Sequence, residues 1–150
     1  MSSASKQPPK GWPRISASVY YQDAKRAIDW LARAFGFEVR LCVEGPGGRI
    51  EHAELVLDGG LIMTADPKTE LGRTWAASPK SLEGANTQSL MVYVEDVDAH
   101  CQQARAAGAT IVTEPTTTDY GPDYWADRIY EAVDLEGHHW WFTQRLRSPQ

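Results

Sequence analysis

Cysteine is scarce in this sequence, and long hydrophobic runs are missing from it. Its 150 residues include two cysteines, Cys42 and Cys101, which lie far apart and form no CxxC pair. We interpret both as small buried hydrophobic side chains of a reducing compartment. No apolar run is long enough to cross a bilayer, and the first residues lack the apolar stretch of a secretion signal. We therefore expect a cytoplasmic protein with no membrane partner.

Positive charge is in the minority. The chain has 15 Lys and Arg against 20 Asp and Glu, a formal net charge of -5, whereas nucleic-acid-binding surfaces are usually basic. The sequence also lacks a Gly-rich phosphate loop, a GxSxG nucleophile motif and the ligand spacing of a zinc site. These absences argue against a nucleic-acid partner and against the most familiar nucleotide-binding, serine-hydrolase and zinc proteins.

The composition is that of an ordinary globular domain, with 42% hydrophobic and 23% charged residues. Residues 1–13 are rich in Ser, Pro and Lys, which predicts a flexible N-terminal arm. We expect a single domain over residues 14–147, because a chain of this length can bury one sizeable core.

Apolar periodicity predicts a strand, a helix and three further strands in the first half. Asp23 offers a side-chain acceptor at the start of the helix, and Gly36 suits the left-handed conformation that ends one. Between them, apolar residues recur at three- and four-residue steps. Gly-rich turns separate the later segments. The predicted strands are 15–21, 38–43, 49–57 and 61–65.

The second half repeats this order. Asp96 and Gly108 bound a second apolar helix stripe, and Asp23 and Asp96 lie about 73 positions apart, which indicates an internal duplication. Residues 66–88 have little periodicity, and long loops of this kind commonly cover a site or an interface. The predicted strands are 89–94, 110–113, 128–133 and 138–144, with one more, faint in the sequence, within 116–125.

Three segments resemble the vicinal-oxygen-chelate superfamily, which includes glyoxalases, bleomycin resistance proteins and dioxygenases. They are YYQDAKRAIDWLARAFGFEV, HAELVLDGGLIM and DRIYEAVDLEGHHWWFTQ. The resemblance implies an α+β fold of two tandem βαβββ modules, about 15–65 and 89–145, joined by the loop 66–88. The modules would form a curved, half-open mixed β-barrel with the helices outside and a ligand cavity inside. Family members of this size usually form homodimers, in which the partner's loops often complete each cavity.

The same resemblance locates the positions where the family's enzymes bind a divalent metal. They fall on Ser16, Met63, Ser89 and Trp141, and none of these side chains is a good metal ligand. The predicted strands at 15–21, 61–65 and 89–94 contain no His, Asp or Glu, so an error of register would not restore a site. Gln88 is the one possible replacement. We therefore expect neither a metal nor another cofactor.

Aromatic side chains are the main candidates for a ligand site. Alternation along the last strand places His139, Trp141 and Thr143 on one face and Trp140 on the other. Trp141 would then either stack a flat ligand or plug an empty cavity. The other candidate ligand-binding residues are Tyr20, Tyr93, Tyr130, Trp75, Tyr124 and Trp125.

His52 and Glu54 lie two apart on a predicted strand and share a face. If this face looks inward, the pair could fix a ligand or transfer a proton, whereas a solvent-facing pair would do neither. The favoured hypothesis is a metal-free protein that sequesters a flat aromatic or amphipathic small molecule. The alternatives are a lyase, isomerase or dioxygenase of the same fold, dependent on a metal or using His52 and Glu54, and a structural or regulatory dimer.

Overall fold

Each half of the chain folds as one helix over a four-stranded sheet, in a computed structural model that describes residues 7–149. The first module contains β1 (Ala17–Ser18), α1 (Ala24–Phe35), β2 (Glu38–Glu44), β3 (Ile50–Leu57) and β4 (Gly60–Thr64). The second contains β5 (Leu90–Tyr93), α2 (Val97–Ala106), β6 (Thr110–Asp119), β7 (Ala126–Val133) and β8 (His139–Arg147). The sheet orders, β1-β4-β3-β2 and β5-β8-β7-β6, match, so the predicted α+β fold of two βαβββ modules is confirmed.

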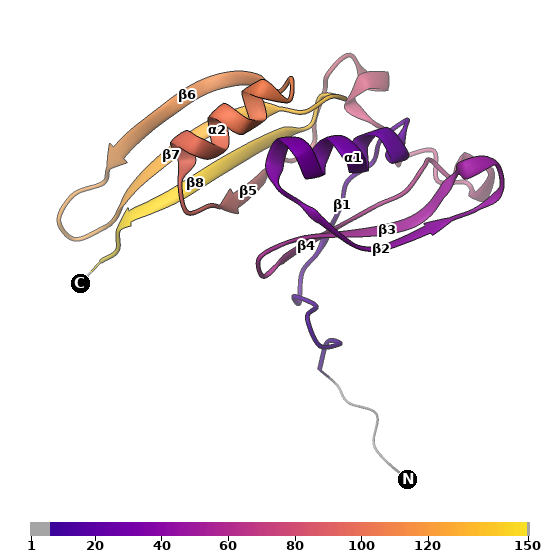
Figure 1. Ribbon diagram of the computed structural model, residues 1–150, viewed down its shortest axis with the longest axis horizontal. Helices are drawn as coiled ribbons and strands as arrows, with labels where there is room; N and C mark the ends of the chain where they lie inside the picture. The colour runs from indigo at the N-terminus through magenta and orange to yellow at the C-terminus, as the bar shows by residue number, and fades with distance from the viewer. Residues whose placement is uncertain (1–6, 150) are drawn as a thin grey trace, which may run out of the picture.

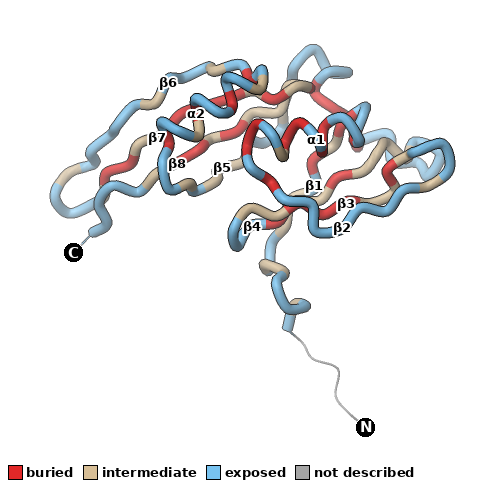
Figure 2. The backbone as a smooth tube through the Cα atoms, in the orientation of Figure 1, coloured by how far each residue is buried: buried red, intermediate tan, exposed pale blue. Residues whose placement is uncertain are grey.

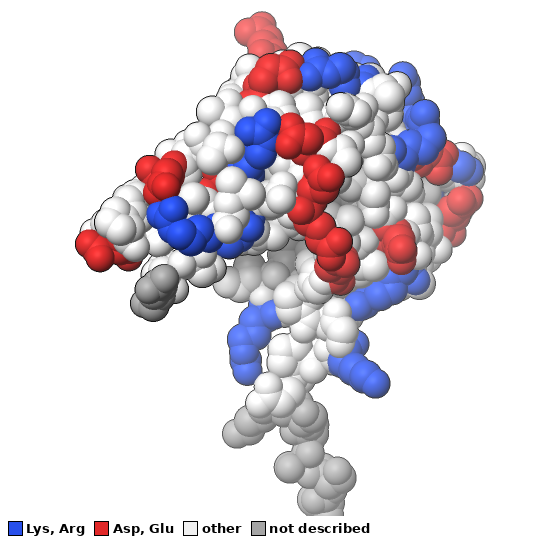
Figure 3. Space-filling view, turned by 60° about the vertical axis from the view of Figure 1, so that its left-hand side comes forward, with Lys and Arg blue, Asp and Glu red and all other residues white. Residues whose placement is uncertain are grey.

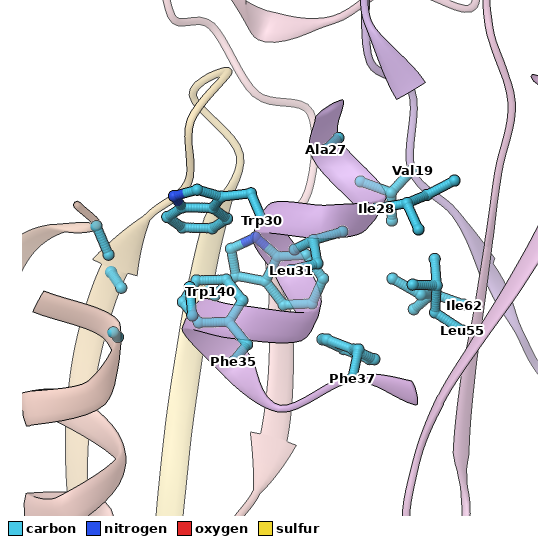
Figure 4. Packing of buried hydrophobic residues seen from close by; sticks show 14 of the residues in the cluster. Val19, Ala27, Ile28, Trp30, Leu31, Phe35, Phe37, Leu55, Ile62 and Trp140 are labelled. Carbon is cyan, nitrogen blue, oxygen red and sulfur yellow. The ribbon is translucent and has the colours of Figure 1, made fainter. Parts of the chain in front are cut away.

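The helices begin where the sequence predicts. Asp23 accepts a hydrogen bond from the backbone N–H of Arg26, and Asp96 accepts one from Ala99, which satisfies free amides of each first turn. Gly36 ends α1 with φ of 83°, a conformation that costs glycine little. The buried face of α1 lies over the sheets, as Figure 4 shows.

The two modules share one hydrophobic core. The Phe35 ring of α1 lies 5.4 Å from that of Trp140 and 4.7 Å from that of Phe142, both on β8. Trp30 donates from Nε1 to the carbonyl of Ala107 at 2.7 Å. Figure 1 shows α1 and α2 in one layer with the two sheets side by side, and Figure 2 shows the buried residues along this layer. The opposite faces of the sheets stay open, and the described strands form no closed barrel.

A buried carboxylate of the β7–β8 turn holds the loop between the modules through hydrogen bonds. Glu136 accepts hydrogen bonds from the Ser78 hydroxyl at 2.6 Å and from the backbone N–H of Gln22 at 2.6 Å. Nearby, Tyr21 donates its hydroxyl hydrogen to Asp134 at 2.6 Å. These contacts connect both modules with the loop, which contains two short 3-10 turns, Thr69–Leu71 and Pro79–Leu82.

Some predicted boundaries are wrong. The first strand is much shorter than 15–21, since only Ala17–Ser18 pairs with β4. The second module has no separate strand within 116–125, because β6 continues to Asp119. One of its two irregularities of register, between Thr113 and Thr116, contains Pro115. Cys101 is buried as predicted, but Cys42 is exposed because it lies on the edge strand β2.

Part of the predicted N-terminal arm, residues 1–6, lies outside the described residues. Its later part contacts the first sheet. There, Arg40 donates to the Gly11 carbonyl at 3.1 Å and lies 4.9 Å from the Trp12 ring centre. Within residues 7–149, no helix is long and apolar enough to cross a membrane.

Candidate functional site

The open faces of the two sheets present equivalent rows of side chains. Strand pairing sets Ser18 beside Met63, Met63 beside Glu54 and Glu54 beside Leu41. In the second sheet, the same pairing gives the row Met91, Trp141, Glu131 and Thr113. Paired strand residues point to the same side, so each open face carries one glutamate at the equivalent place in its row.

A central recess of about 200 Å³ lies between the strands β1, β5 and β8 and the loop 66–88. The rings of Tyr20 and Trp75 meet edge to face there, 5.8 Å apart, and Trp75 is 71% exposed. His139 lines the same recess. The structure thus brings together three residues that the sequence nominates for ligand binding.

A second recess of about 380 Å³ lies on the open face of the second sheet, next to the first. It is lined by Trp141, His139, Glu131 and Gln88, among others. His139 Nδ1 lies 2.6 Å from Glu131 Oε1, and Glu131 is only 9% exposed. The sequence did not single out Glu131, although a carboxylate inside the run 129–133 is a usable signal.

A third recess of about 130 Å³ lies on the first sheet and is lined by Ser18, Tyr20, His52 and Met63, among others. His52 and Glu54 form the predicted pair, with His52 Nε2 at 3.1 Å from Glu54 Oε1, and Arg40 Nε donates to the second oxygen at 2.9 Å. Burial opposes ionisation of Glu54, but the hydrogen bonds from His52 and Arg40 outweigh it, so the pKa of Glu54 is lowered.

These three recesses form one band across the molecule. Ser18 and Tyr20 line both the first and the third recess, and His139 lines both the first and the second. The band has aromatic side chains along it and a His–Glu pair towards each end. We call it the aromatic band.

The remaining predicted aromatics cluster further along the second sheet. Arg145 lies between the rings of Tyr93, at 5.8 Å, and Trp125, at 5.5 Å, and donates to Asp127 at 2.6 Å. Tyr124 meets Trp125 edge to face at 6.1 Å. Figure 3 shows both mixed groups of basic and acidic side chains and a run of acidic ones on one face. Arg145–Asp127 and Arg147–Asp119 are ion pairs of the second module.

Tyr130 is the exception among the candidates, and its predicted place along the cavity is wrong. It is fully buried and pairs with Phe142, so it points towards the helices instead of the open face. Its hydroxyl lies 2.6 Å from Nδ1 of His100, whose Nε2 lies 2.8 Å from the Phe35 carbonyl. Burial lowers the pKa of His100 and raises that of Tyr130 above its ordinary range.

The side chains at the family's metal positions do not fit a divalent cation. Ser16, Met63, Ser89 and Trp141 offer two hydroxyls, a thioether and an indole, where such an ion needs several carboxylate or imidazole donors. The described residues contain no group of three or more His, Cys, Asp or Glu side chains arranged to hold a metal. His139 and Glu131, which line the same recess as Trp141, are hydrogen-bonded to each other.

Comparison with known proteins agrees with the fold. Residues 15–142 match the family model of the Glyoxalase/Bleomycin resistance protein/Dioxygenase superfamily. The uncharacterized protein Mb0911c of Mycobacterium bovis is 34% identical over 136 residues, which are 91% of this chain and 86% of that protein.

Two solved structures are similar over most of their length. TioX from Micromonospora sp. ML1 is 34% identical, with a TM-score of 0.66 over 88% of this chain and 95% of TioX. TnmS3, an antibiotic binding protein from Streptomyces sp. CB03234, is 20% identical, with a TM-score of 0.61 over 87% of this chain and 93% of TnmS3. The chain therefore belongs to the glyoxalase/bleomycin resistance protein/dioxygenase superfamily.

Proposed function

We propose that this protein binds and sequesters a flat aromatic or amphipathic small molecule in the aromatic band, without a metal or another cofactor. The observation that carries the proposal is the placement of Tyr20, Trp75, Trp141 and His139 along contiguous recesses. Large rings with a few polar groups beside them are the usual lining of a small-molecule site. A sequestering protein acts by mass action and needs affinity rather than chemistry.

The ion pairing of Glu54 supports binding over catalysis. A general base works best when its pKa lies near the working pH. Glu54 is instead ion-paired with Arg40, and its pKa is lowered. TnmS3, which has this fold, is by its name an antibiotic binding protein, so the fold is compatible with a binding role, although fold alone does not decide function.

We also propose that a second copy of the chain completes the site. An apolar groove of about 500 Å³ lies between the edge strand β5 and the β3–β4 turn. Ile15, Met91 and Tyr93 line it and are 90%, 59% and 50% exposed. Exposed apolar side chains of this size are commonly covered in a subunit interface.

Quenching of tryptophan fluorescence by a broad panel of aromatic metabolites and antibiotics tests the proposed function. We expect saturable binding of at least one compound, with the affinity lowered in Trp75→Ala and Trp141→Ala. Trp30→Phe serves as the control, since Trp30 lies in the core. Absence of any saturable ligand across the panel would contradict the proposal.

A further inference from the structure

We propose that the Glu131–His139 pair makes the recess beside Trp141 selective for planar aromatic ligands that carry a hydroxyl, or another hydrogen-bond donor, on one edge. This inference rests on the proposed function and specifies the class of ligand. The two residues come from neighbouring strands, β7 and β8, and line the same recess as Trp141.

The hydrogen bond between the two residues decides what His139 can offer. An ionised carboxylate only accepts hydrogen bonds, so His139 Nδ1 donates to Glu131 Oε1 over the 2.6 Å between them. A neutral imidazole with its proton on Nδ1 has a lone pair on Nε2. Among residues 7–149, His139 Nε2 has no hydrogen-bond partner. In this neutral form of the pair, the recess offers an acceptor that a ligand's donor can satisfy.

The glutamates of the two sheets have different partners. Glu54 occupies the equivalent place in its row, and there Arg40 supplies the positive charge. No arginine or lysine reaches Glu131 within the part of the chain that the structure describes. Its partners are His139 and, at 3.4 Å, the Thr113 hydroxyl. The shorter hydrogen bond of Glu131 is thus the one with the imidazole that lines the recess.

Trp141 sets the orientation of the ligand. Residues two apart on a strand point to the same side, so His139 and Trp141 are neighbours on the open face of β8. In the proposed pose, an aromatic ring stacks on the Trp141 indole with its edge towards His139. A donor on that edge would meet Nε2, whereas an ether oxygen at the same place would meet a second acceptor.

Matched pairs of ligands test this selectivity. The probes are a naphthol with its methyl ether, and umbelliferone with its methyl ether, titrated by calorimetry into the full-length protein. We expect the hydroxyl compound of each pair to bind about tenfold tighter, the order of one hydrogen bond. In His139→Leu the preference should fall to within about twofold, and an unchanged urea midpoint would show that the variant remains folded. Glu131→Gln should also reduce the preference, because an amide can donate to Nδ1 and so fixes neither tautomer.

The outcomes separate the two proposals. Equal affinity within each pair, or a preference that persists in His139→Leu, overturns the selectivity and leaves the binding function in place. If none of the four probes binds, the selectivity is overturned as well. Only a negative result across the whole aromatic panel overturns the binding function itself.

Discussion

Two adjacent tryptophans of β8 have opposite surroundings. Trp140 is fully buried and donates from Nε1 to Asp134 at 3.1 Å, whereas Trp141 is half-buried and lines the second recess. Successive strand residues point to opposite faces, so one step along the chain separates the core from the candidate site.

This difference predicts opposite consequences for two equivalent substitutions. Trp140→Ala should lower the free energy of unfolding by about 3–5 kcal/mol, because it leaves a cavity and removes a donor from a buried carboxylate. Trp141→Ala should cost less than about 1.5 kcal/mol and weaken an aromatic ligand by about tenfold or more. Urea unfolding and calorimetric titration measure the two effects. A large loss of stability in Trp141→Ala would indicate that this ring is a plug rather than a platform.

Alternation along β8 was sufficient to separate Trp140 from Trp141 using the sequence alone. It failed for Tyr130 because the face of β7 depends on its register with β8, where Tyr130 pairs with Phe142. The Glu131–His139 pair depends on the same register. The sequence alone therefore did not predict which residues of different strands contact each other in the site.

At the scale of elements, His100 connects α2 with the end of α1 and with β7. Its two ring nitrogens contact the Phe35 carbonyl and the Tyr130 hydroxyl, and burial lowers its pKa from the ordinary value of 6.5. Below this ordinary value the unfolded chain binds a proton that the folded protein resists. Stability that is fully present above pH 6.5 is therefore lost as the pH falls through the folded pKa.

His100→Gln tests this linkage. The urea midpoint of the natural protein should fall as the pH is lowered from about 7.5 to about 5.5, and the variant should show a shallower fall because it lacks this group. The variant should also be less stable at the higher pH, where two partners lose their hydrogen bonds. Identical pH slopes in the two proteins would contradict the assignment.

The helices and most strands followed from local signals, namely capping aspartates, apolar stripes and glycine turns. The irregular strands did not follow from such signals. In β2 a break in register at Arg40 directs this side chain to Glu54. In β6 a break between Thr113 and Thr116 lets the strand continue past Pro115. Bulges of this kind insert residues without a clear sequence signature, so neither the Arg40–Glu54 ion pair nor the length of β6 was predictable.

At the scale of the whole molecule, the open faces and the exposed groove predict self-association. Sedimentation should give twice the monomer mass of 16.7 kDa. Ile15→Asp should weaken the dimer by at least about tenfold, since burying an isoleucine contributes about 1.5–3 kcal/mol. Leu71→Asp is the matched control, because Leu71 is also exposed but does not line the groove. A monomer at high concentration, or equal effects of the two substitutions, would contradict this role of the groove.

The most direct test of the account is the effect of a chelator on ligand binding. Protein purified without chelator would be titrated with its best aromatic ligand before and after removal of divalent ions, with metal content measured in parallel. We expect no stoichiometric metal and an unchanged dissociation constant, because the positions of Ser16, Met63, Ser89 and Trp141 offer no suitable donors. A stoichiometric divalent metal, together with binding that is lost on its removal and restored on its return, would contradict it.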